Sequence, residues 1–299
     1  MSPSIDTPKP QSHHAPLKTI SDTSNQDHPF NKAWRGNKAG TIRLEGIPKF
    51  ADPMDEREWI KAHMAAAFRF WGKMGFGEGV SGHITVRDPI LEDHYWMNPI
   101  AVHFSAITKS KLVLVGPDGY ASPHGAQLPI NAAGFFIHSA IHKARPDIHS
   151  AAHCHSIHGK AWSTFGKPVD IITQDSCVFY DNLGVYKNFG GIVLAQEEGE
   201  NIARALGSKY KACILQNHGL LTLGNTVDEA VHLFLALEKH CQVQLLTEAA
   251  TAGGLQKTLI DPEDAAYSGA LLQNPHIGYT NFQPEYELLV EETNGAFLK

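Results

Sequence analysis

Hydrophobic and polar positions follow helical and strand spacing from about residue 46 onward. In residues 53–73, apolar side chains recur every three or four positions and acids occupy the first turns, which predicts a helix. "HITVRD" (83–88) is predicted to be a strand. "KLVLVGPDGY" (111–120) is predicted to be a strand that runs into a Pro-Asp-Gly turn.

The stretch "INAAGFFIHSAIHKARPDIHSAAHCH" predicts a helix followed by a strand. Asn131 is a favourable N-cap for a helix that runs to about Ala144. Pro146 should stop that helix, because the residue before a proline is disfavoured in helical conformation. In the strand predicted for "DIHSAAHCH", His153 and His155 share one face.

Strands and helices continue to about residue 250. Thr226 and Glu229 form a capping box that should start a long helix ending near Ala250. The segments before it are predicted to be a short strand in "GGIVLA" (190–195), a helix in "EEGENIARALG" (197–207) and two strands in "ACILQNHGLLTLG" (212–224).

The two ends of the chain differ from this middle region. Residues 1–45 are rich in Ser, Pro, Asp and Asn and contain few large aliphatic side chains, so we expect a mobile N-terminal arm. Residues 46–250 are expected to form one α/β domain. Residues 251–299 form a C-terminal extension of mixed character.

Composition narrows the class of protein. The 299 residues are 42% hydrophobic and 19% charged, as in an ordinary soluble globular protein. The net charge is −6 and no basic stripe occurs, so we expect neither nucleic acid nor a membrane as a partner. The four cysteines are widely spaced, which is typical of reduced thiols and indicates a cytoplasmic protein.

Three histidines are candidate metal ligands. Because the chain has 18 histidines, one His-x-His pair is expected by chance. On a strand, however, the side chains of His153 and His155 would lie about 6–7 Å apart on one face and could converge on one ion. His218, before the flexible Gly219, is the best third ligand. Three imidazoles would leave an open coordination position, but three unrelated core histidines are the alternative.

Other histidines are weaker candidates. His138 and His142 have the i, i+4 spacing of a helix face, but no Glu between them makes a zinc-protease motif. We interpret them as residues on the face of a helix. His158 breaks the two-residue alternation and is interpreted as an ordinary polar residue.

The two histidine segments together resemble the class II aldolase/adducin family. The likeness rests on Arg-Pro-Asp, then His-x-His, then "LQNHGLLTLG" with a capped helix after it, and it covers roughly residues 55–250. It implies a three-layer α/β/α sandwich around a mainly antiparallel sheet. It also implies a homotetramer with active sites at subunit interfaces, and a divalent metal, usually zinc, held by His153, His155 and His218.

The chain departs from the family where sugar-phosphate aldolases carry Ser-Ser-Glu before the helix. There the glutamate is the acid/base and the serines help to hold phosphate, but this chain has Ala132, Ala133 and Gly134. A Gly-Asn that is common after the first helix is Gly82-His83 here. We therefore expect a small-molecule substrate without a phosphate.

A different residue must then move protons. His83 is the first catalytic candidate, because histidine titrates near neutral pH; a packed structural role is the alternative. Ser105 is the candidate contact for a substrate carboxylate or hydroxyl. Weaker candidates, for which turn or edge roles are the alternative, are Glu78, Gln174, Asp175 and Tyr180.

Three functions fit the resemblance. The favoured one is a metal-dependent lyase that breaks or forms a C–C or C–O bond beside a carbonyl, with Zn²⁺ as the expected metal. The second is an Fe²⁺-dependent oxygenase that decarboxylates a 2-oxo acid, as in a branch of aminocoumarin biosynthesis that resembles this family. The third is a non-catalytic binding module like the adducin head.

Overall fold

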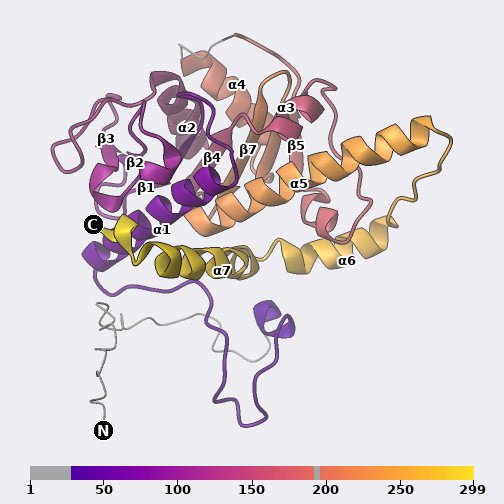
Figure 1. Ribbon diagram of the computed structural model, residues 1–299, viewed down its shortest axis with the longest axis horizontal. Helices are drawn as coiled ribbons and strands as arrows, with labels where there is room; N and C mark the ends of the chain where they lie inside the picture. The colour runs from indigo at the N-terminus through magenta and orange to yellow at the C-terminus, as the bar shows by residue number, and fades with distance from the viewer. Residues whose placement is uncertain (1–27, 192–195) are drawn as a thin grey trace, which may run out of the picture.

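The computed structural model describes residues 28–191 and 196–299 (Figure 1). Within these ranges a seven-stranded sheet lies between two helical layers. Helices α2 (Ala132–Ala144) and α4 (Gln196–Leu206) cover one face, and α1 (Pro53–Lys73), α3 (Ile157–Ser163) and α5 (Val227–Ala252) cover the other. The α/β/α sandwich is confirmed.

The sheet has the strand order β3-β2-β1-β4-β7-β6-β5. Each neighbouring pair is antiparallel except β5 and β6, so the predicted, mainly antiparallel sheet is confirmed. The central strand is β4. The strands are β1 (His83–Arg87), β2 (Tyr95–Met97), β3 (Val113–Val115), β4 (Ser150–Cys154), β5 (Leu183–Tyr186), β6 (Ala212–Leu215) and β7 (Gly219–Gly224).

The predicted helix starts are confirmed by their caps. The Asn131 side chain accepts a hydrogen bond from the backbone N–H of Gly134 at 3.1 Å and so begins α2. Thr226 accepts one from the N–H of Glu229 and begins α5. The Glu229 carboxylate does not close the box on Thr226 but accepts from the N–H of Asn225, one residue earlier.

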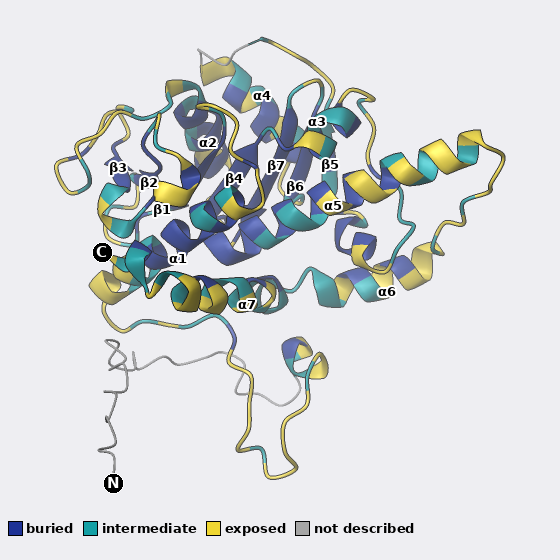
Figure 2. Cartoon of the chain, in the orientation of Figure 1, coloured by how far each residue is buried: buried dark blue, intermediate teal, exposed yellow. Residues whose placement is uncertain are grey.

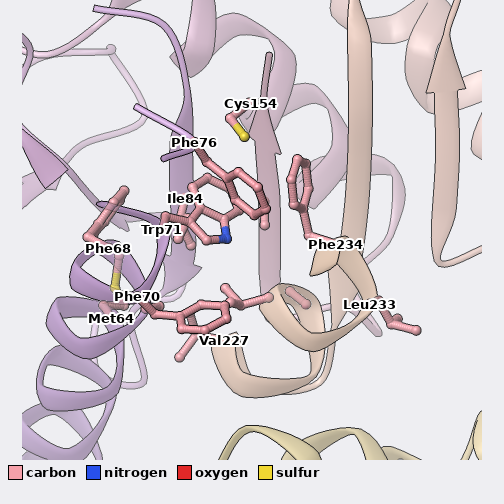
Figure 3. Close-up of a cluster of buried hydrophobic side chains, with 14 of the residues drawn as sticks. Met64, Phe68, Phe70, Trp71, Phe76, Ile84, Cys154, Val227, Leu233 and Phe234 are labelled. Atoms are coloured by element: carbon pink, nitrogen blue, oxygen red, sulfur yellow. The ribbon is translucent and has the colours of Figure 1, made fainter. Parts of the chain in front are cut away.

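A large apolar core joins the sheet to α1 and α5. Figure 3 shows Trp71 of α1 beside Phe234 of α5, and the two ring centroids are 4.7 Å apart. Ile84 of β1 and Cys154 of β4 extend this cluster into the sheet, and both are fully buried. Figure 2 shows that most strand residues are buried, whereas the edge strand β5 is only partly buried and α5 becomes exposed toward its C-terminal end. This core fixes β1 and β4 against the helices.

The predicted arm and the predicted strand at 190–195 fall partly on residues that the structure does not describe. Residues 1–27 of the arm, and 192–195 of that strand, lie outside the described ranges. Within the arm's described part, Phe30 is buried, and its ring centroid lies 5.6 Å from that of His276. Nearby, the backbone N–H of Ile47 donates to Nδ1 of His276 at 2.9 Å. This part of the chain therefore contacts the C-terminal extension.

The C-terminal extension contains two helices, α6 (Pro262–Leu272) and α7 (Pro275–Thr293). Helix α7 packs on α1 and α5: the buried Phe282 meets Phe70 edge to face at 5.5 Å, and Tyr286 stacks on His63 at 4.1 Å. The His63 ring also pairs with the buried carboxylate of Asp228 at 2.6 Å. The extension is thus joined to the domain by buried contacts.

Within residues 28–191 and 196–299, no helix combines the length and the apolar character needed to cross a membrane.

Packing of α7 can be tested with Phe282→Ala. Because Phe282 is 2% exposed, we expect this change to lower the free energy of unfolding by about 3–5 kcal/mol, measured by urea denaturation. The control is Tyr120→Ala, in the turn that follows β3, where the side chain is 75% exposed and the change should stay within about 0.5 kcal/mol. Equal effects of the two variants would contradict the described docking of α7.

Candidate metal centre

The sheet brings His153, His155 and His218 together where its inner strands β4 and β7 meet the loops at one end of the sheet. His153 lies on β4, His155 follows the end of that strand, and His218 lies in the turn between β6 and β7. Strand β4 pairs with β7 in a register that sets His153 opposite Leu221. The pairing of two sequence-distant segments therefore places the third imidazole beside the other two.

The turn that carries His218 depends on Asn217 and Gly219. Asn217, not the glycine, adopts the left-handed conformation (φ 58°) that reverses the chain. Gly219 is required for a different reason: a Cβ there would lie 2.9 Å from the carbonyl oxygen of Cys154. Glycine is therefore needed at position 219 because β7 passes close to the end of β4, and not because the backbone there must be flexible.

The three imidazoles converge. One ring nitrogen from each lies within 4.8 Å of the others, which makes this group a possible metal site among the described residues. The ring centroids are 5.2 Å apart for His153 and His155, 4.7 Å for His153 and His218, and 4.8 Å for His155 and His218. Nδ1 of His153 is 2.8 Å from the carbonyl oxygen of Leu220, to which it can donate. That bond leaves Nε2 of His153 as its free ligand atom.

Burial keeps these rings neutral. It lowers the pKa of His153 well below its ordinary value, and the neighbouring His218 lowers it further. Burial also lowers the pKa of His155, and it lowers that of His218 to about 4. Neutral imidazoles carry the lone pairs that a metal requires, so the donor set fits a divalent metal.

A carboxylate from α5 holds the chain just after His155. Glu238 is 5% exposed and accepts hydrogen bonds from the backbone N–H groups of His158 and Gly159 at 3.0 and 2.7 Å. It also accepts from the Ser156 hydroxyl and lies 2.9 Å from Nδ1 of the His158 ring. These contacts cap α3 and anchor the segment that carries His155. Sequence reasoning missed Glu238, because it lies about 80 residues away.

A cavity of about 580 Å³ opens beside the three histidines. Lys160 is the one Lys or Arg among its described lining residues, and its ammonium pairs with Glu78 at 2.6 Å. The lining is otherwise apolar or uncharged at neutral pH. It includes Val80, Ser81, Gly82, His83, Asn131, Ala132, Ala133, Ile137, Phe189, Gly191 and Asn217.

His83 lies in the wall of this cavity, at the start of β1. Its ring centroid is 5.0 Å from that of His153, and its side chain is buried. Neither ring nitrogen has a hydrogen-bond partner among the described residues. Burial, followed by the neighbouring histidines, lowers the pKa of His83 well below its ordinary value. His83 is therefore a neutral imidazole with two free polar atoms beside the candidate metal centre.

The glycine at position 134 is explained by His83. A Cβ on Gly134 would lie 2.7 Å from both Cγ and Nδ1 of the His83 ring. Any side chain at position 134 would collide with the His83 ring. The two departures from the family pattern, His83 and Gly134, are therefore coupled. The ring of His83 occupies the space that a side chain at position 134 would need.

The remaining candidates lie elsewhere. Ser105, in the 3₁₀ turn η3 (Phe104–Ala106), packs against Gly72 of α1 and is not among the residues that line the cavity. Asp175 borders a different cavity, beside α5. His138 and His142 face Thr85 of β1 and do not join the three candidate ligands.

Comparisons with known proteins identify the family of this chain. A family model described as the class II aldolase and adducin N-terminal domain matches residues 62–245. The meiotically up-regulated gene 14 protein of Schizosaccharomyces pombe is 43% identical over 85% of this chain and 97% of its own length.

Two further relatives have enzyme names. The 4-hydroxy-3-prenylphenylpyruvate oxygenase/4-hydroxy-3-prenylbenzoate synthase of Streptomyces roseochromogenus is 39% identical over 84% of this chain and 89% of its own length. The solved structure of an L-fuculose 1-phosphate aldolase from Glaciozyma antarctica is 42% identical and covers 85% of this chain and 97% of its own, with a TM-score of 0.77. Both the matched domain and these relatives show that the chain belongs to the class II aldolase/adducin family.

Proposed function

We propose that this protein is a metal-dependent lyase or decarboxylase that cleaves a C–C bond beside a carbonyl or hydroxyl group of a small, unphosphorylated acid. The observation that carries the proposal is the convergence of three neutral imidazoles on the wall of a 580 Å³ cavity. A structural metal site would be closed by a fourth protein ligand, whereas this one faces open space.

His153, His155 and His218 would hold the ion, and Zn²⁺ is the metal we propose first. A divalent metal here supplies a Lewis acid that polarises a carbonyl oxygen. The Leu220 carbonyl fixes the ring of His153, and Glu238 fixes the segment after His155. Both contacts limit the motion of the rings before the ion binds.

His83 would handle the proton. Its ring lies beside His153 and has two nitrogens without a protein partner among the described residues, so one can accept a proton from substrate in the cavity. Gly134 leaves the room that this ring needs. This assignment gives the chain a proton acceptor where the glutamate of sugar-phosphate aldolases has no counterpart.

The cavity lining argues against a phosphorylated substrate. Recognition of phosphate requires several donors aimed at its oxygens. Ala132 and Ala133 present methyl groups at the start of α2, and Lys160 is already paired with Glu78. The mostly apolar lining favours an aliphatic or aromatic acid.

A second candidate is an Fe²⁺-dependent oxygenase that decarboxylates a 2-oxo acid. It is favoured by the relative from Streptomyces roseochromogenus, which is named as an oxygenase. Imidazole ligands suit Fe²⁺ as well as Zn²⁺. The two candidates differ in the metal and in the need for oxygen, not in the histidines that they use.

We also propose a cytoplasmic homotetramer. All four cysteines are free and buried, as suits a reducing compartment. The end of α5 and the helix α6 project from the body of the molecule (Figure 1), and Leu246, Leu255 and Tyr267 there are 66%, 68% and 84% exposed. Apolar side chains gathered on such a projection favour contact with another subunit.

Metal binding can be tested on protein purified without added metal. We expect about one zinc or iron ion per chain by elemental analysis. We also expect the metal, at about 100 times its Kd, to raise the free energy of unfolding by about 2.7 kcal/mol. His153→Ala should abolish both effects, whereas His94→Gln, outside the cavity lining, should keep both. A metal retained by His153→Ala would contradict the proposed ligands, and an unresponsive wild type would favour an adducin-like module.

Activity can be tested with a panel of 2-oxo and hydroxy acids, each with and without a phosphate. Turnover should occur with unphosphorylated members and require the metal; oxygen uptake during turnover would favour the oxygenase. His83→Gln should lower kcat by about 10²–10⁴-fold and leave the metal content unchanged, because a proton acceptor is lost and no ligand is. Preference for a phosphorylated substrate, or full activity in His83→Gln, would refute these assignments.

A further inference from the structure

Two exposed apolar side chains line the cavity beside the candidate metal centre. Val80, in the loop between α1 and β1, is 53% exposed, and Phe189, in the segment after β5, is 57% exposed. Both are among the residues that line this cavity. One exposed apolar side chain needs no explanation, but two on the wall of one cavity indicate a surface that a ligand covers. We call Val80 and Phe189 the apolar pair.

The apolar pair comes from both sides of the strands that carry the candidate ligands. Val80 precedes β1 and Phe189 follows β5, and in the sheet the strands β4, β7 and β6 lie between these two. His83, at the start of β1, is paired with His153 at the end of β4, and Tyr186, at the end of β5, is paired with Leu215 at the end of β6. The cavity therefore reaches across this end of the sheet, well beyond the three imidazoles.

Contacts with α4 hold the segment that carries Phe189. The Tyr186 hydroxyl donates to the Glu198 carboxylate at 2.8 Å, and Nδ2 of Asn188 donates to the Tyr186 hydroxyl at 3.2 Å. Gly190 lies against the same carboxylate, since a Cβ there would be 2.7 Å from Oε2 of Glu198. Residues on both sides of Phe189 are therefore tied to α4, and this fixes where the ring meets the cavity.

Contacts with two helices hold the loop that carries Val80. The carbonyl of Val80 accepts a hydrogen bond from Nδ2 of Asn131, the N-cap of α2, at 3.4 Å. Glu78, two residues earlier, pairs with Lys160 of α3 at 2.6 Å and forms a β-bridge with Ser81. The loop is thus joined to one helix on each face of the sheet, and Val80 lies between these two attachments.

The cavity is larger than a short acid requires. Its volume of about 580 Å³ lies within the range of roughly 300–1,000 Å³ that is typical of pockets for drug-sized ligands. A three-carbon acid at the histidines would leave the apolar pair uncovered. The remaining aliphatic lining consists of Ala132, Ala133 and Ile137. Such a wall offers no hydrogen bonds from its side chains, so an apolar group that covers it gains free energy from its removal from water.

We propose that Val80 and Phe189 determine specificity by binding an apolar body of the substrate, so that the preferred acids carry a phenyl-sized aliphatic or aromatic group. The inference rests on the proposed function, because that function places the reacting end of the acid at the three histidines. Short acids reach the histidines but leave the apolar pair exposed. Larger acids bury both side chains and bind more tightly for that reason.

The test compares Phe189→Ala with Phe165→Ala in zinc-loaded protein. Phe165 is the matched control, because it is 56% exposed and does not line the cavity. The ligands are 3-phenylpropanoate and propanoate, which differ by the phenyl ring and lack a reactive oxo group, and titration calorimetry measures their Kd. Wild type and Phe165→Ala should bind 3-phenylpropanoate about 10-fold more tightly than propanoate, or better. Phe189→Ala should lose most of this difference and bind propanoate as wild type does.

Turnover provides a second readout. Phe189→Ala should raise KM for phenylpyruvate about 10-fold and leave its kcat and the KM for pyruvate unchanged, because uniform binding is lost and no reacting group is. Val80→Ser, the second variant, should change the same quantities in the same direction by a smaller factor.

Three results would overturn the proposal. The first is equal affinity of wild type for 3-phenylpropanoate and propanoate, and the second is unchanged affinity in both Phe189→Ala and Val80→Ser. The third is a smaller assembly of Phe189→Ala in sedimentation, which would show that Phe189 contacts another subunit instead of a ligand. Binding of 3-phenylpropanoate that depends on Phe189, in a protein inactive on every acid, would support the apolar pair and refute only the proposed function.

Discussion

The register of three neighbouring antiparallel strands is the constraint on which the site depends. His83 of β1 is paired directly with His153 of β4, and His153 is paired with Leu221 of β7, close to the turn that carries His218. Because side chains alternate along a strand, a slip of one residue would turn His153 into the opposite layer of the sandwich. The apolar core between the sheet and α1 and α5, which includes Ile84 and Cys154, fixes this register. Packing on one face of the sheet thus positions the rings of His83 and His153 on the other face.

The opposite face combines two demands that conflict. Strand β1 and helix α2 must pack closely, yet their contact contains imidazoles and a hydroxyl where apolar side chains would be simpler to bury. Gly134 leaves space for the His83 ring, so β1 and α2 can pack closely. The Thr85 hydroxyl lies within hydrogen-bonding distance of two buried rings, those of His138 and His142. Such a polar contact gives less stability than a fully apolar one. We interpret this polar contact between β1 and α2 as serving the placement of the His83 ring rather than the stability of the fold.

Much of this arrangement follows from local sequence. The caps at Asn131 and Thr226, the stop at Pro146 and the two-residue spacing of His153 and His155 are short-range signals, and the helix and strands that they predict are present. The third candidate metal ligand, His218, is indicated by its flanking residues, which predict a turn at the end of a strand. The family resemblance implies the layers of the sandwich, and it supports the metal site that the spacing of the histidines already indicates.

What the sequence could not provide depends on contacts between distant residues. Glu238 caps α3 across about 80 residues, and the collision between residue 134 and His83 appears only when α2 lies on β1. The docking of α7 rests on Phe282 and Tyr286, which look like scattered aromatics until Phe70 and His63 of α1 lie opposite them. Periodicity records which residues share a face, but not what that face meets.

Anomalous diffraction from crystals grown with zinc, recorded on both sides of the zinc absorption edge, tests the central claim most directly. The account predicts one strong peak per chain at about 2.0–2.1 Å from a ring nitrogen of each of His153, His155 and His218. A chain whose His218 ring points away from the other two, or whose zinc lies elsewhere, would contradict it.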